Sequence, residues 1–142
     1  MDIERWMKKP VITVRPRDSI RHAREIMEEH RINQLPVVVN QRLVGIVTDR
    51  DLRDAFPSAF EPPRRDRDRR AAPDPQDVLV DAVMSRNVLS LGPKDSMAAA
   101  ARLMRRERIG AVPVVEGERL AGIVTRSDVL SAFVANGDSS DG

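Results

Sequence analysis

The stretch Leu43-Val44-Gly45-Ile46-Val47-Thr48-Asp49-Arg50-Asp51 occurs a second time as Leu120-Ala121-Gly122-Ile123-Val124-Thr125-Arg126-Ser127-Asp128. Each copy is a short apolar run with one glycine, followed by Thr-x-x-Asp and another apolar segment. The β-branched apolar run indicates a buried strand, and Thr-x-x-Asp indicates a helix start, because an N-cap threonine accepts hydrogen bonds from free backbone N–H groups. Each copy therefore predicts a corner at which a strand passes directly into a helix.

The repeat extends well beyond these corners. Pro36 and Pro113 lie 77 positions apart, and the same offset aligns the segment Ile3–Phe56 with its second copy without a gap. A repeat on this scale indicates one structural unit used twice. We therefore expect a first repeat at residues 3–56, a flexible linker rich in proline and arginine at 57–77, a second repeat at 78–134 and a disordered tail at 135–142.

Each repeat predicts the order β-α-β-β-α. In the first repeat we expect the lead-in Ile3–Met7, a strand at Val11–Val14, a helix from Asp18 or Ser19 to His30, strands at Leu35–Val39 and Leu43–Val47 around an Asn40-Gln41 turn, and a closing helix from Thr48. One repeat is too small to bury a sufficient core alone. The predicted fold class is thus α/β (α+β), with two repeats packed in pseudo-two-fold symmetry.

Composition excludes several classes of protein. The chain has 142 residues, no cysteine and a net charge of +2, so neither a disulfide framework nor a thiolate metal site is expected. Aromatic residues make up 3%, which disfavours stacking platforms for single-stranded nucleic acid. The segment Met1–Pro10 has no apolar core of signal-peptide length, and no run reaches the roughly 20 apolar residues that span a bilayer. We expect a cytoplasmic protein without membrane contact.

No pattern of catalytic residues is present in the sequence. There is no phosphate-binding glycine-rich loop, no nucleophile with a neighbouring base, and no cluster of His or Cys. His22 and His30 fall on the polar side of the predicted helix, which is typical of solvated residues. We therefore expect no enzyme activity, no metal and no catalytic cofactor.

The segment Ile-Asn-Gln-Leu-Pro-Val-Val (Ile32–Val38) and the Gly-Ile-Val-Thr-x-x-Asp corners resemble those of cystathionine-β-synthase (CBS) domains. Two such repeats resemble the tandem CBS pair, or Bateman module, and the layout is similar to small stand-alone bacterial CBS-pair proteins related to the acetoin-utilisation protein AcuB. The resemblance implies clefts between the paired repeats that bind adenosine derivatives such as AMP, ADP, ATP or S-adenosylmethionine. It also implies that the corner Thr or Ser contacts the phosphate of the ligand and that the corner Asp binds the ribose hydroxyls.

Two sets of ligand-binding residues follow from the resemblance. One set combines Thr125, Ser127 and Asp128 with Val11, Ile12, Ile32, Asn33 and Gln34; the other combines Thr48, Arg50 and Asp51 with Val88, Leu89, Ile109, Gly110 and Ala111. Arg50 and Arg126 are candidates to reach phosphate. An ionised carboxylate can accept hydrogen bonds from both hydroxyls of a ribose. The alternative, that Thr-x-x-Asp is a helix cap and nothing more, stays open.

The implied function is ligand sensing, in which a bound adenine nucleotide changes the shape of the module or its dimer geometry and thereby signals to a separate effector protein. A homodimer contact is expected from Leu52, Phe56, Val129 and Phe133. Two other classes remain open. One is a structural or interaction module without a ligand, and the other is a weak nucleic-acid binder that uses Arg64–Arg70, although the acidic residues within that segment disfavour it.

Overall fold

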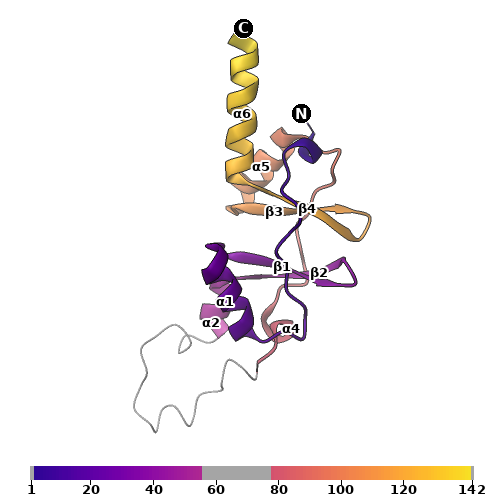
Figure 1. Cartoon of the computed structure of the whole chain (residues 1–142), viewed down its shortest axis with the longest axis vertical. Helices are drawn as coiled ribbons and strands as arrows, with labels where there is room; N and C mark the ends of the chain where they lie inside the picture. Colours follow the sequence, from indigo (N-terminus) through magenta and orange to yellow (C-terminus); the bar gives the residue numbers. More distant parts are fainter. Residues whose placement is uncertain (1, 56–77, 142) are drawn as a thin grey trace. The chain divides into compact units, whose positions relative to one another are not determined.

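The computed structural model describes residues 2–55 and 78–141, with the backbone alone for 137–141 (Figure 1). The predicted linker 57–77, with Arg64–Arg70, and Phe56 lie outside the described residues. The chain divides into two units. Unit 1 comprises Met1–Val11, Gln41–Leu43 and Leu89–Gly142, and unit 2 comprises Ile12–Asn40 and Val44–Val88.

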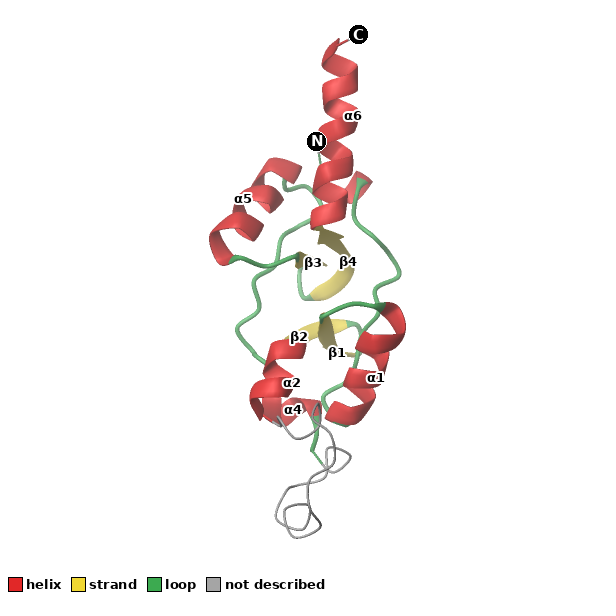
Figure 2. Ribbon diagram, turned by 90° about the vertical axis from the view of Figure 1, so that its left-hand side faces the viewer, coloured by secondary structure: helices red, strands yellow, loops and turns green. Residues whose placement is uncertain are grey.

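Unit 2 contains a β-hairpin with helices beside it (Figure 2). Its elements are α1 (Ile20–His30), β1 (Gln34–Val39), most of β2 (Arg42–Thr48), α2 (Asp49–Ala55) and α4 (Val80–Val83). Ser19 caps α1, because its Oγ accepts a hydrogen bond of 3.0 Å from the backbone N–H of His22. Asn40 and Gln41 have φ values of 50° and 70°. These angles are those of a tight hairpin turn, so the predicted helix, turn and hairpin are confirmed.

Unit 1 repeats this arrangement. Its elements are η1 (Ile3–Arg5), α5 (Met97–Glu107), β3 (Ala111–Glu116), β4 (Arg119–Thr125) and α6 (Arg126–Asp141). β3 and β4 pair antiparallel, with a register shift between Val114 and Val115, and Ser96 caps α5 as Ser19 caps α1. α6 extends to Asp141, whereas a disordered tail was expected from residue 135. No proline interrupts this segment, so its backbone can continue the helix.

The segment Val11–Val14 does not form the predicted strand. It makes a single parallel bridge, between Val14 and Val37, and Leu91 makes the corresponding bridge to Val114 in unit 1. The Val14 N–H donates to the carbonyl of Pro36 at 3.1 Å, and the Val38 N–H donates to the carbonyl of Val14 at 2.9 Å. The prolines on either side, Pro10 and Pro16, cannot donate hydrogen bonds, which limits the length of any ladder here.

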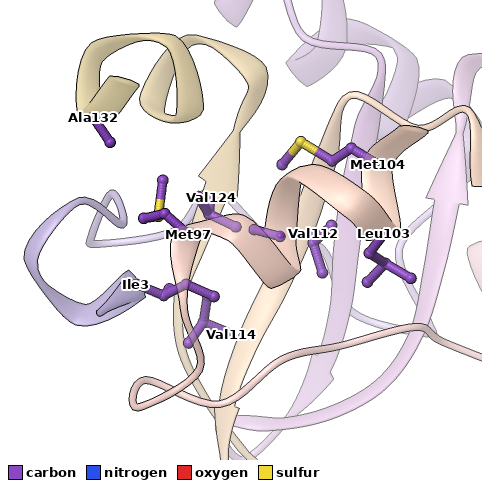
Figure 3. Close-up of a cluster of buried hydrophobic side chains, with 9 residues drawn as sticks. Ile3, Met97, Leu103, Met104, Val112, Val114, Val124 and Ala132 are labelled. Carbon is purple, nitrogen blue, oxygen red and sulfur yellow. The ribbon is translucent and has the colours of Figure 1, made fainter. Parts of the chain in front are cut away.

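The units do not coincide with the sequence repeats, because the two lead-in segments, Ile3–Lys8 and its equivalent Val80–Ser85, are exchanged: each lies in the unit that is otherwise formed by the other repeat. Ile3, from the first repeat, is fully buried in the core of unit 1 with Met97 and Val114 of the second repeat (Figure 3). Val80, from the second repeat, is fully buried in the core of unit 2 with residues of the first repeat such as Val47. Each core therefore contains residues of both sequence repeats.

The glycine in the strand before each corner makes this exchange possible. A Cβ atom at Gly45 would lie 2.7 Å from Met84 Sδ and 2.9 Å from the carbonyl oxygen of Ser85. A Cβ atom at Gly122 would lie 2.6 Å from Met7 Sδ. Any side chain at these positions would meet the exchanged lead-in segment, so a glycine is required where the segment crosses the strand.

Candidate functional site

The corner of unit 2, called the Asp51 corner (Thr48–Asp51), lies where β2 ends and α2 begins. The Thr48 N–H donates to Asp51 Oδ2 at 2.9 Å, and the Asp51 N–H donates to Thr48 Oγ1 at 3.0 Å. This is the reciprocal bonding of a capping box. The Asp49 N–H donates to the carbonyl of Asn33 at 2.8 Å and ties the start of α2 to the residue before β1.

The corner of unit 1, called the Asp128 corner (Thr125–Asp128), has the same backbone design. The Thr125 N–H donates to Asp128 Oδ2 at 2.7 Å, and the Asp128 N–H donates to Thr125 Oγ1 at 3.3 Å. The Thr125 hydroxyl also donates to Asp128 Oδ2 at 2.9 Å. The Arg126 N–H donates to the carbonyl of Gly110, which is the equivalent of the Asp49–Asn33 bond. Both corners are therefore helix caps, and a cap is compatible with a ligand role.

The two corners differ in the second carboxylate oxygen. In the Asp128 corner, Lys8 Nζ lies 2.6 Å from Asp128 Oδ1 and 3.1 Å from Thr125 Oγ1. Asp128 is 8% exposed and is the one buried charged residue in the described part of the chain. In the Asp51 corner, by contrast, Oδ1 of Asp51 has no hydrogen-bond partner among residues 2–55 and 78–141, and the side chain is half-buried.

Sequence reasoning did not identify Lys8. The equivalent position in the second repeat is Ser85, so comparison of the two repeats does not mark Lys8 as a site residue. Lys8 is also separated from Asp128 by 120 positions in the sequence. The contact exists because the lead-in segment is exchanged: Lys8 forms an antiparallel bridge with Ile123, two residues before the corner threonine. No local pattern in the sequence predicts that the lead-in segments are exchanged between the units.

The chemical capacity of each corner follows from these bonds. In each corner Oδ2 accepts the hydrogen bond that closes the helix cap, and Oδ1 takes no part in the cap. A carboxylate oxygen accepts hydrogen bonds, and hydroxyl groups are suitable donors. Among residues 2–55 and 78–141 no donor occupies Oδ1 of Asp51, while Oδ1 of Asp128 accepts a hydrogen bond from the Lys8 ammonium.

The predicted binding residues are distributed over both units. Unit 1 holds Val11, Leu89, Ile109, Gly110, Ala111, Thr125, Ser127 and Asp128. Unit 2 holds Ile12, Ile32, Asn33, Gln34, Thr48, Arg50, Asp51 and Val88. The structure brings together each corner Thr with its Asp. Which of the remaining residues contact a ligand stays a prediction.

Two arginines were proposed to reach phosphate. The Arg50 side chain is 90% exposed, and its Nε lies 3.9 Å from Oδ2 of Asp54 on the next turn of α2. Arg126 has its Nε 3.7 Å from the point that a Cβ atom would occupy at Gly110, so its side chain crosses the start of β3. Neither guanidinium is buried, and each can change rotamer to meet an anion.

Several other predictions concern the helices. Leu52 was expected on the surface as a dimer contact, but it is 1% exposed in the core of unit 2, because α2 has few other apolar residues to pack inward. Val129 is half-buried against the core of unit 1, while Phe133 is 74% exposed. His22 and His30 are exposed as expected.

No group of three or more His, Asp or Glu side chains in residues 2–55 and 78–141 is arranged to hold a metal ion. Over the same residues, no helix combines the length and the apolar character needed to cross a bilayer.

Comparison with known families gives a match over most of the chain. The CBS domain profile matches residues 2–58 and again residues 80–135. A CBS domain-containing protein of Dictyostelium discoideum is 34% identical over 138 residues, which cover 93% of this chain and 90% of that protein. Inosine-5'-monophosphate dehydrogenase of Korarchaeum cryptofilum is 36% identical over 89% of this chain, but the match spans only 23% of the dehydrogenase.

Solved structures with the same fold include two informative cases. The acetoin utilization protein AcuB from Vibrio cholerae has a TM-score of 0.79 at 25% identity, with 99% of this chain and 96% of that chain covered. The second is the CBS domain pair of protein MJ0100 in complex with 5'-methylthioadenosine and S-adenosyl-L-methionine. It has a TM-score of 0.72 at 28% identity, with 96% of this chain and 98% of that chain covered.

Proposed function

The chain belongs to the CBS domain family, with two domains in tandem, and on this basis we propose that it is a regulatory module that binds adenosine derivatives. AMP, ADP and ATP are the proposed ligands, with S-adenosylmethionine as a further candidate. The proposal includes no catalytic step and no catalytic cofactor.

The observation that carries the proposal is the Asp51 corner. Its Oδ2 is used by the helix cap, whereas its Oδ1 has no partner within residues 2–55 and 78–141 and remains available to a donor. Ribose offers two neighbouring hydroxyl donors. The similar CBS pair of MJ0100 is described in complex with two compounds that both contain adenosine, which supports this class of ligand.

We assign the roles as follows. Asp51 and Asp128 accept hydrogen bonds from ribose hydroxyls, and the hydroxyls of Thr48, Thr125 and Ser127 face the phosphate or its replacement. Arg50 and Arg126 are the proposed phosphate cations, since a guanidinium can bind phosphate through two parallel hydrogen bonds. The proposed adenine contacts are Val11, Ile12, Ile32, Asn33 and Gln34 in one set, and Val88, Leu89, Ile109, Gly110 and Ala111 in the other.

The proposed output is a change of shape or of dimer geometry that a separate cytoplasmic partner reads. A ligand shifts such an equilibrium only by the difference between its affinities for the two states. The cap bonds of each corner connect the proposed ribose carboxylate directly to the start of α2 or α6. A ligand that pulls on this carboxylate therefore acts on the first turn of that helix.

Calorimetric titration tests the proposal. AMP, ADP, ATP and S-adenosylmethionine are titrated into the wild type and into Asp51→Ala and Asp128→Ala. Asp81→Ala is the matched control, because Asp81 also lies in unit 2 and its side chain pairs with Arg86, which belongs to neither corner. We expect each corner variant to lose one class of sites and the control to lose none. If the wild type is folded and binds none of the four compounds, the corners are helix caps only. The interpretation as a ligand-free interaction module would then replace that of a ligand sensor.

A further inference from the structure

The position of Lys8 is fixed by its backbone. The Lys8 N–H donates to the carbonyl of Ile123 at 2.7 Å, and the Ile123 N–H donates to the carbonyl of Lys8 at 3.0 Å. The side chain then extends along β4 to Asp128, with its Nζ 2.6 Å from Oδ1. The Lys8 side chain is 55% exposed and that of Asp128 is 11% exposed, so the ammonium covers a buried carboxylate and also faces solvent.

The other unit supplies a natural control for this arrangement. Ser85 and Ile46 exchange the same pair of backbone hydrogen bonds, at 2.8 and 2.9 Å. The backbone therefore crosses the strand in the same way in both units, but the side chain at the equivalent position is a short neutral hydroxyl. The chain holds two copies of one corner, and the described residues supply an internal cation to only one of them.

This difference affects what each corner can bind. A ribose hydroxyl that takes Oδ1 of Asp128 has to displace the Lys8 ammonium. An ammonium separated from its carboxylate loses a charge-assisted hydrogen bond, and this loss is not compensated by an uncharged ligand. A phosphate on the same ligand compensates for it, because it provides a new anion for a side chain that is flexible and partly solvated.

We propose that Lys8 determines specificity in the Asp128 corner, by admitting adenosine ligands that carry a phosphate and discriminating against those that do not. Binding exchanges the Lys8–Asp128 ion pair for a Lys8–phosphate pair and a ribose–Asp128 hydrogen bond. In the part of the chain that the structure describes, the Asp51 corner has no equivalent ammonium and so lacks this source of discrimination. The inference rests on the proposed function, since it assumes that the corners bind an adenosine ligand.

AMP and adenosine are the probes, because they differ only in the phosphate. Affinities for both are measured by calorimetry in an Asp51→Ala background, so that the Asp128 corner supplies the remaining site. We expect Lys8→Met to lower the affinity for AMP by about tenfold or more, and to leave the affinity for adenosine unchanged or increased. Lys94→Met is the charge-matched control, because Lys94 also lies in unit 1 and pairs with Glu4 rather than with a corner. It should preserve the ratio of the two affinities.

A second variant tests the same idea without removing a buried contact. In an Asp128→Ala background, Ser85→Lys places an ammonium beside the Asp51 corner, and we expect it to increase the preference for AMP over adenosine there. Circular dichroism confirms that each variant is folded.

The outcomes separate the two proposals. If the wild type binds neither AMP nor adenosine, the proposed function fails and this inference with it. If it binds, and Lys8→Met changes both affinities by the same factor while Ser85→Lys leaves the preference unaltered, the role of Lys8 is refuted and the proposed function stands.

Discussion

Replacing Gly45 by alanine should destabilise the protein because the exchanged lead-in segment passes directly over it. The new Cβ would lie 2.9 Å from the carbonyl oxygen of Ser85 and 2.7 Å from Met84 Sδ. The thioether can change rotamer at little cost. The carbonyl cannot move freely, because Ser85 and Ile46 hold each other through two backbone hydrogen bonds.

The expected magnitude follows from two opposing effects. Overpacking of this kind costs about 1 to 3 kcal/mol. Alanine also restricts the unfolded chain, which returns about 0.4 to 1 kcal/mol where the folded backbone accepts it. The two ranges leave a net loss of about 0 to 2.6 kcal/mol for Gly45→Ala. We expect about 1 to 2 kcal/mol within it, because the close contact is to a backbone carbonyl at 2.9 Å. Gly122→Ala should cost less, because its nearest backbone atom, the carbonyl oxygen of Lys8, lies at 3.1 Å rather than 2.9 Å.

Urea denaturation followed by circular dichroism measures these changes. Gly92→Ala is the matched control, since its Cβ would be 3.7 Å from the nearest atom, an ordinary contact. It should leave the stability unchanged or slightly increased. A double variant Met7→Ala/Gly122→Ala should show a coupling, because removing the thioether relieves part of the clash. Equal stability of Gly45→Ala and Gly92→Ala would refute the exchange of lead-in segments as the reason for the corner glycines.

Three further predictions use the same denaturation assay or chromatography. Ser19→Ala removes the cap of α1 and should lower the free energy of unfolding by about 1 kcal/mol, and an unchanged urea midpoint would contradict the cap. Leu52→Ala should cost about 2 to 5 kcal/mol, because the side chain is 1% exposed in the core of unit 2, whereas a surface contact residue would cost almost nothing. Phe133→Ser should change monomer stability by less than about 0.5 kcal/mol, because the ring is 74% exposed. If α6 forms the proposed dimer contact, the same variant should elute later than the wild type in size-exclusion chromatography, and an unchanged elution volume would argue against that contact.

Local patterns in the sequence predicted the regular elements well. Helix α1 begins after Ser19 and ends at His30, and β1 and β2 flank the Asn40-Gln41 turn, as the apolar spacing indicated. These signals succeed because a cap, a turn or an amphipathic face depends on residues within about four positions of each other. The reciprocal Thr-x-x-Asp bonds were predictable for the same reason, since both partners lie on one helical turn.

Predictions that depended on distant contacts were less accurate. Leu52 was placed on the surface because a short helix with one strong apolar residue gives no clear indication of its buried face. Val11–Val14 looks like a strand from its composition, yet the structure gives it a single bridge through Val14. Both outcomes depend on which segment packs alongside, and this information is not local.

The sequence by itself determined the duplication, the order of the elements and the two capped corners, because each is specified by neighbouring residues or by a fixed offset of 77 positions, as between Pro36 and Pro113. Only the tertiary structure decided that the lead-in segments are exchanged and that Gly45 and Gly122 must therefore lack side chains. It also decided that Lys8 pairs with Asp128, whereas no cation pairs with Asp51 among residues 2–55 and 78–141. The physical reason is that Lys8 and Asp128 are 120 positions apart. Their contact is created by burying the two lead-in segments in two separate cores, and no property of either residue's neighbours specifies it.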